Sequence, residues 1–208
     1  MKFVTISYTH TQHRSVALPH GDVLLHAGDV TSRGTEAEVK DFLRWFAQQD
    51  FEHKIFIAGN HDFFFEKHDA DYIQNLIPTG VTYLNDSETT INGIKIWGSP
   101  VTPWFFDWAF NRQRGADIAK HWALIPPKTA IIMTHGPVYG YLDKTTRGEK
   151  VGCADLRETI ENLQPKVHIG GHIHEAYGQI QTENTLFINA SVLNVHYKMT
   201  NVPVVFEM

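Results

Sequence analysis

Side chains that can bind metals or transfer protons follow five short apolar runs of the sequence. In chain order they are His10, Asp29, Asn60, His61, Asp62, His135, His172 and His174. The apolar runs are typical of buried strands, and in α/β folds ligands collect in the crevice at the carboxyl ends of strands. We therefore expect these residues, although far apart in sequence, to meet in one site.

Imidazole, carboxylate and carboxamide groups form a ligand set suited to manganese, iron, zinc or cobalt. The set holds more ligands than one ion needs, so it predicts two divalent or mixed-valence transition metals. Two metals about 3.5 to 4 Å apart, bridged by a carboxylate, could polarise a phosphoryl oxygen and generate a hydroxide for in-line attack. A histidine beside a carboxylate could then protonate the departing alkoxide.

The composition restricts the other possibilities. Cys153 is the only cysteine, which excludes an intramolecular disulfide and a thiolate zinc cluster. The net charge of -5 disfavours long nucleic acids as partners, because phosphate contacts dominate their binding. No phosphate-binding loop, dinucleotide-binding glycine motif or serine-hydrolase elbow is present, so those three classes of enzyme are excluded.

The chain has no apolar stretch of signal-peptide form and no run approaching the roughly 20 residues that span a bilayer. Its 208 residues include 42% hydrophobic and 20% charged residues, which is ordinary for a globular protein. We expect a single cytoplasmic domain, residues 1–208, with no membrane partner.

Continuous apolar runs predict strands that are buried on both faces. The runs are KFVTIS, DVLLHAG, HKIFIAG, KIWGS, TAIIMTHG, VHIGGH, LFINAS and VPVVFEM. Asn92 and Gly93 stand between two of the predicted strands and indicate a tight hairpin.

Two segments show the spacing of amphipathic helices. Apolar residues recur at helical spacing between residues 35 and 49, where Thr35 and Glu38 form a capping box, and again between residues 155 and 163. Interleaved strands and helices predict a layered α/β domain that contains a mixed sheet.

The order of the polar motifs resembles that of the calcineurin-like metallophosphoesterases. The motifs stand in this chain as SYTH, AGD, AGNHD, MTHG and GGHIH. The segments GSPVTPWFFDWAF, THGPVYGYLD, VGC and GHIHEAYG are similar to the smaller MPPED-like branch, which resembles class III cyclic-nucleotide phosphodiesterases. The resemblance spans nearly the whole chain and implies a four-layer αββα sandwich of two facing mixed β-sheets.

The same resemblance implies a role for each site residue. His10, Asp29 and His174 would hold one metal. The second metal would be held by Asp29, Asn60, His135 and His172, with Asp29 as the bridge. His61 would donate a proton to the leaving group, and Asp62 would orient His61.

The family has aspartate where this chain has Tyr8. A phenol has a reference pKa of about 10, so it binds as phenolate only when a strongly acidic cation lowers that value. Three interpretations remain open. Tyr8 weakens or empties the first metal site, or it ligates ferric iron, or another group takes its place, His13 being the nearest.

Several residues are candidates for contacts with the substrate, namely His13, Arg112, Arg114 and Arg147. The aromatic cluster over residues 104–110 is interpreted as core or as a lid hinge, or alternatively as a surface that stacks on a nucleobase.

The leading hypothesis is a metal-dependent phosphodiesterase, with a metal-bridging hydroxide as nucleophile and His61 as general acid, acting on a small phosphodiester such as a cyclic nucleotide. The alternatives are a phosphomonoesterase or nuclease of the same superfamily, and a non-catalytic nucleotide-binding scaffold on the same fold.

Overall fold

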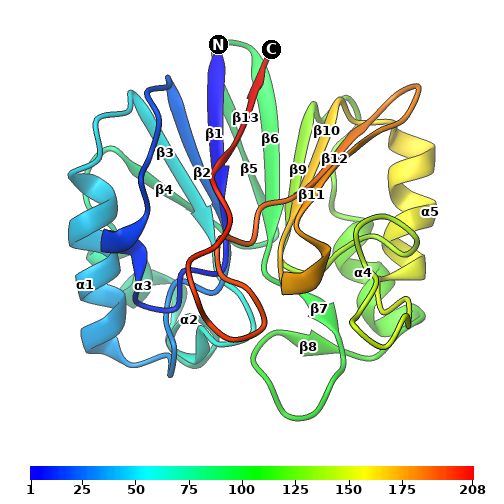
Figure 1. The fold of residues 1–208 in the computed structure, drawn as a ribbon, viewed down its shortest axis with the longest axis horizontal. Coiled ribbons are helices and arrows are strands. Elements are labelled where there is room, and N and C mark those ends of the chain that lie inside the picture. The colour runs from blue at the N-terminus through cyan, green and yellow to red at the C-terminus, as the bar shows by residue number, and fades with distance from the viewer.

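Two β-sheets packed face to face form the centre of the protein (Figure 1). The structure is a computed structural model and describes residues 1–208. The first sheet has the strand order β13-β1-β2-β3-β4. Its strands are β1 (Lys2–Ile6), β2 (Val23–Ala27), β3 (His53–Ile57), β4 (Val81–Leu84) and β13 (Val204–Glu207). All run parallel to their neighbours except β13, which is antiparallel to β1.

The second sheet has the strand order β11-β12-β10-β9-β6-β5. Its strands are β5 (Ser87–Ile91), β6 (Ile94–Ser99), β9 (Ile131–Thr134), β10 (Val167–Gly170), β11 (Gly178–Gln181) and β12 (Leu186–Asn189). The four central strands are parallel and the two edge strands antiparallel, so both sheets are mixed. A separate two-stranded ladder joins β7 (Thr102–Pro103) to β8 (Asn111–Arg112).

Helices cover the outer face of each sheet, which confirms the predicted αββα order (Figure 1). The first sheet is covered by α1 (Glu36–Ala47), α2 (Phe63–Lys67) and α3 (Ala70–Leu76). The second is covered by α4 (Ala116–Trp122) and α5 (Ala154–Leu163). Two single-turn 3-10 helices, η1 (His13–Ser15) and η2 (His174–Ala176), lie in loops that follow strands β1 and β10.

Aliphatic side chains fill the space between the two sheets. Leu25 and Ile57 of the first sheet join Ile131 and Ile169 of the second in one buried cluster. Alternate residues of the same strands point outward and pack beneath the helices. Burial on both faces explains why the strands are continuous apolar runs rather than alternating patterns.

The local signals in the sequence are confirmed by the structure. Thr35 caps α1, where its hydroxyl accepts the N–H of Glu38 and the Glu38 carboxylate accepts the N–H of Thr35. The second predicted helix is α5, which is capped by the sulfur of Cys153. Asn92 and Gly93 form the turn of the β5–β6 hairpin, both with positive φ.

The two sheets are joined where β1 and β12 end. The N–H of Ser7 donates to the carbonyl of Ala190 at 2.8 Å, and the Ser7 carbonyl accepts the N–H of Val192 at 3.1 Å. Only a residue without a side chain fits beside this junction, because a Cβ on Gly171 would collide with the Ser7 hydroxyl. The loops after β1, β2 and β3 are therefore held opposite the loops after β9 and β10.

None of the helices combines the length and the apolar character that crossing a membrane requires.

The capping box of α1 has a measurable contribution to stability. Thr35→Ala should lower the free energy of unfolding by about 1 kcal/mol, because the N–H of Glu38 loses its acceptor. Urea denaturation measures the change. Thr35→Ser keeps the hydroxyl and should remain close to the wild type, so equal losses in both variants would contradict the capping role.

Candidate metal centre

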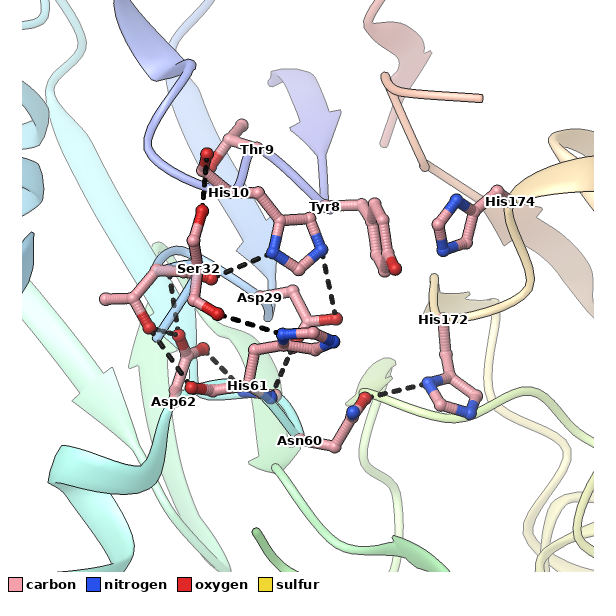
Figure 2. A network of polar contacts seen from close by, with 12 residues as sticks. Tyr8, Thr9, His10, Asp29, Ser32, Asn60, His61, Asp62, His172 and His174 are labelled. Carbon is pink, nitrogen blue, oxygen red and sulfur yellow. Dashed lines mark hydrogen bonds and ion pairs between the residues drawn. The ribbon is translucent and has the colours of Figure 1, made fainter. Parts of the chain in front are cut away.

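The polar residues that follow the strands meet in one cleft between the two sheets (Figure 2). The loops after β1, β2 and β3 bring His10, Asp29, Asn60 and His61, and the loops after β9 and β10 bring His135, His172 and His174. His10, Asp29, Asn60 and His135 are buried, whereas His61, His172 and His174 are half-buried at the mouth. The structure thus assembles every predicted ligand in one place.

Backbone carbonyl groups fix the orientation of four imidazole rings in this cleft. Their Nδ1 atoms contact carbonyl oxygens as follows: His10 to Thr31 at 2.9 Å, His61 to Ser32 at 3.1 Å, His135 to Ala27 at 3.1 Å and His174 to Asn194 at 3.0 Å. A carbonyl oxygen can only accept a hydrogen bond, so each Nδ1 carries the proton. Each neutral ring therefore presents a lone pair on Nε2, the usual arrangement of a metal-binding histidine.

One group of donor atoms is spaced as around a single ion. Nε2 of His135 lies 2.8 Å from Oδ1 of Asn60 and 3.3 Å from Oδ2 of Asp29, and Nδ1 of His172 lies 2.9 Å from the same Asn60 oxygen. Neighbouring ligands of an ion with bonds of about 2.1 Å lie roughly 3 to 3.4 Å apart. The residues present therefore fit a transition metal at this position, with Asp29, Asn60, His135 and His172 as candidate ligands.

Two buried donor atoms in the cleft have no hydrogen-bond partner. They are Nε2 of His10 and Oδ2 of Asp29, which lie 3.6 Å apart. Both carry lone pairs when the imidazole is neutral and the carboxylate ionised, so nothing on the protein satisfies them. Oδ2 of Asp29 also faces His135, which places this single oxygen between the two sets of candidate ligands.

The electrostatics of the cleft favour the metal-binding forms of His10, His172 and Asp29, whereas they favour the protonated form of His135. Burial lowers the pKa of His10 to about 4 and that of His172 to about 3, so both rings are neutral near pH 7. Burial alone would raise the pKa of Asp29, but the neighbouring His135 and His10 outweigh it and lower that pKa. Burial also opposes protonation of His135, yet the charge of Asp29 raises its pKa. A cation between these groups would satisfy them together.

The backbone of the site is held in an uncommon conformation. Four site residues have positive φ, namely Tyr8 at 62°, His10 at 38°, Asp29 at 56° and His172 at 65°. Positive φ in residues other than glycine is uncommon and tends to occur at functional sites. Gly59 is required at the same place, because a Cβ there would collide with the Asp29 carboxylate and the His135 ring.

Tyr8 occupies the space between two predicted ligands of the first metal. Its ring centroid lies 4.0 Å from that of His10 and 3.6 Å from that of His174, and the side chain is buried (Figure 2). Its hydroxyl lies 3.5 Å from the hydroxyl of Tyr197. Burial, together with the charge of Asp29, raises the pKa of the Tyr8 phenol well above its ordinary value.

His61 is held on three sides. Its ring packs on Trp108 with centroids 4.3 Å apart, and its edge contacts the His10 ring at 4.5 Å. Its backbone N–H donates to Oδ1 of Asp29 at 2.9 Å. With Nδ1 bonded to the carbonyl of Ser32, Nε2 is the ring nitrogen that remains free.

The orienting role predicted for Asp62 is wrong. Its carboxylate is buried and accepts hydrogen bonds from the N–H groups of Val30, Thr31 and Gly59 and from the Thr31 hydroxyl. These contacts tie the loop that carries Asp29 to the loop that carries His61. Asp62 therefore acts on the backbone, and the carbonyl of Ser32 orients the His61 ring.

The predicted substrate contact of His13 is also wrong, as is its role as a replacement ligand. The ring is buried beneath α1, where it packs on Trp45 with centroids 4.9 Å apart and lies 3.2 Å from the carboxylate of Asp41. The single turn η1 directs it away from the cleft.

The three predicted arginines differ in what they can bind. Arg112 pairs with Glu66 at 3.3 Å and lines a separate pocket, so the structure does not place it at the metal cleft. Arg114 donates to the carbonyls of Val151 and Gly152, both at 2.8 Å, and it lines the same pocket as Arg147. Arg147 is exposed and makes no hydrogen bond or ion pair with the protein.

Several residues of the site were not predicted from the sequence. Ser32 and Asn194 act through their backbone carbonyls, which any residue would supply. Trp108 was assigned only to an aromatic cluster, and Tyr197 was not considered. The segment GSPVTPWFFDWAF gave a partial signal for Trp108, whereas nothing pointed to Tyr197.

The calcineurin-like phosphoesterase family model matches residues 8–176, which include every candidate ligand of the cleft. The chain therefore belongs to the calcineurin-like phosphoesterase family. Phosphoester hydrolysis is the class of reaction that this membership supports, and the donor groups of the cleft agree with the family's use of metals.

Individual relatives agree with this assignment. Metallophosphoesterase domain-containing protein 1 of Homo sapiens is 40% identical over 100% of this chain and 71% of its own length. A UPF0046 protein of Caenorhabditis elegans is 38% identical over 99% of this chain and 74% of its own. The crystal structure of phosphopantetheinyl hydrolase from Mycobacterium tuberculosis shares the fold, with a TM-score of 0.66 at 16% identity over 94% of this chain and 90% of that one.

The contacts of Asp62 predict a large effect on stability. Asp62→Ala should lower the free energy of unfolding by about 3 kcal/mol or more, because it strands three buried N–H groups. Urea denaturation of the metal-free protein measures this change in the free energy of unfolding. Asp69→Ala, at an exposed aspartate without a capping bond, should change stability by less than about 0.5 kcal/mol. Similar values for the two variants would contradict the role of Asp62.

Proposed function

We propose that this protein is a metal-dependent phosphodiesterase that acts on small phosphodiesters such as cyclic nucleotides. One observation carries the proposal. Imidazole rings fixed by backbone carbonyls direct Nε2 of His10 and of His135 at the oxygens of Asp29 and Asn60, and neither Nε2 of His10 nor Oδ2 of Asp29 makes a hydrogen bond within the protein. A divalent ion held by Asp29, Asn60, His135 and His172 would supply a Lewis acid that withdraws charge from a phosphoryl oxygen.

His61 is the candidate general acid. Its Nδ1 proton is committed to Ser32, so the proton given to the leaving oxygen is the one carried on Nε2 of the imidazolium. Contacts with the Ser32 carbonyl and the Trp108 ring fix the direction of the His61 ring without a carboxylate partner.

A larger pocket beside the metal cleft suits the organic part of a substrate. We call it the aromatic pocket, and its lining includes Trp104, Phe105, Phe106, Arg147, His172 and Ile173. Its volume is about 570 Å³, within the range of small-molecule sites. The cleft that contains Asn60 and His61 shares Phe105, His172 and Ile173 with it, so a phosphate at the cleft would extend a substituent into the aromatic pocket.

The lining of the aromatic pocket favours a planar, polar substituent. Trp104, Phe105 and Phe106 are all more than half exposed and can stack on a flat ring, which nucleobases provide. The guanidinium of Arg147, which has no partner in the protein, lines the same pocket. The net charge of -5 disfavours a long polyanion, which supports a small nucleotide rather than a nucleic acid.

One observation favours a second function, a nucleotide-binding scaffold without turnover. Tyr8 replaces a ligand and fills part of the metal cleft. The free Nε2 of His61 argues for catalysis instead, since a scaffold has no use for a proton donor.

Hydrolysis of matched diesters and monoesters tests the proposed function. We expect Mn²⁺-dependent cleavage of bis(4-nitrophenyl) phosphate and of a cyclic nucleotide, lost on chelation, with 4-nitrophenyl phosphate much slower. A preference for the monoester would support a phosphomonoesterase. Tight nucleotide binding without cleavage, also in Tyr8→Asp, would support the scaffold.

His61→Asn should separate substrates by their leaving groups. Loss of the proton donor should slow a cyclic nucleotide, whose alkoxide leaves poorly, by about 10²- to 10⁴-fold, whereas a 4-nitrophenyl diester should lose far less. Steady-state kinetics on both substrates measure the contrast. Equal losses would refute the role of His61 as general acid.

Arg147→Ala should raise the KM for a nucleotide substrate by about tenfold, because one charge-assisted contact is removed, while kcat changes little. The matched control is Arg44→Ala, at an exposed arginine of α1 that pairs with Asp41. If KM is the same in both variants, the substrate does not extend toward Arg147.

A further inference from the structure

The position between His10 and His174 does not fit a metal. An ion bound there would lie about 2.1 Å from a nitrogen of each ring. The Tyr8 ring instead lies between the two imidazoles at contact distance from both, with centroids 4.0 and 3.6 Å away. A ring face offers no lone pair, so Tyr8 occupies the position without supplying a ligand.

The ring of Tyr8 is fixed in this place. The backbone N–H of Tyr8 donates to the carbonyl of Gly28 at 2.9 Å, and its φ is 62°. The side chain is 3% exposed and packs in the apolar cluster with Val30, Val192 and Leu193. Moving the ring out would expose this surface to water, so a cation cannot displace it without loss of packing.

The remaining donor atoms divide unequally between the two positions. Oδ2 of Asp29 lies closer to His135, at 3.3 Å, than to His10, at 3.6 Å. The other oxygen of Asp29 already accepts the N–H of His61. The position beside His135 thus keeps four candidate ligands, whereas the position beside His10 keeps three groups: His10, the half-buried His61 and the Asp29 oxygen that both positions share.

We propose that this protein binds one transition-metal ion and not two. The ion is held by Asp29, Asn60, His135 and His172. His174 contributes no ligand, because the Tyr8 ring separates it from Asp29. The proposal rests on the metal centre of the proposed function but not on its substrate, and it is tested without turnover.

The test counts ions in the metal-free protein titrated with Mn²⁺. Calorimetry gives the stoichiometry, and electron paramagnetic resonance distinguishes an isolated Mn²⁺ from an exchange-coupled pair. We expect one isolated ion in the wild type and a coupled pair in Tyr8→Asp, which frees the space and supplies a carboxylate. Two ions in the wild type, or none, would overturn the proposal.

Further variants separate blockage by the ring from ligation by the phenol. Tyr8→Phe keeps the ring and loses the hydroxyl, so it should still bind one ion with the affinity of the wild type. His174→Ala should leave the count unchanged in the wild type but reduce it from two to one in Tyr8→Asp. His172→Ala should remove the single ion. Weaker binding of the ion by Tyr8→Phe, or by the single variant His174→Ala, would show that the changed side chain is a ligand. Either result would refute the proposal.

The same comparison connects the centre to its activity. Phosphodiester turnover should rise in Tyr8→Asp together with metal content. If the ion count rises and turnover does not, the one-ion proposal stands and the proposed function is wrong. Thermal unfolding of each variant in its metal-free form verifies that the change in count does not reflect loss of folding.

Discussion

A single buried oxygen, Oδ2 of Asp29, organises the centre of this protein. It lies 3.3 Å from Nε2 of His135 and 3.6 Å from Nε2 of His10, and it makes no hydrogen bond within the chain. An ionised carboxylate at this depth is unfavourable unless a positive charge compensates it. The fold holds the anion there by strained backbone at Asp29 and by the close approach that Gly59 permits. The other candidate ligands surround this oxygen where they could hold a compensating cation.

The neighbouring residues serve this arrangement through the backbone as much as through side chains. Asp62 joins the loops after β2 and β3, and carbonyl groups at Ala27, Thr31 and Ser32 set the ring directions of three histidines. Such contacts fix the tautomer as well as the orientation of each ring. A rigid set of lone pairs results, and the buried Tyr8 ring lies beside it, in contact with His10 and His174.

The sequence predicted much of this because the signals were chemical and local. Buried parallel strands gave continuous apolar runs, and their polar ends gave Asp29, His135 and the residues between 60 and 62. The short helices α2, α3 and α4 have only five to seven residues, which is too short for a helical period to stand out, and they were missed. His13 was misplaced because its proximity to His10 in sequence concealed the turn η1. The Ser32 carbonyl left no signal, since backbone atoms are common to all residues.

The four candidate ligands of the ion come in equal parts from both sheets. Asp29 and Asn60 follow strands of the first sheet, and His135 and His172 follow strands of the second. A bound cation would therefore act as a cross-link across the sandwich, in addition to the apolar layer between the sheets. An unfolded chain cannot bring these four ligands together, so the ion would bind only the folded protein. A free metal concentration of a hundred times the dissociation constant would then stabilise the fold by about 2.7 kcal/mol. The supply of metal would then govern how long the folded molecule survives as well as what it can catalyse.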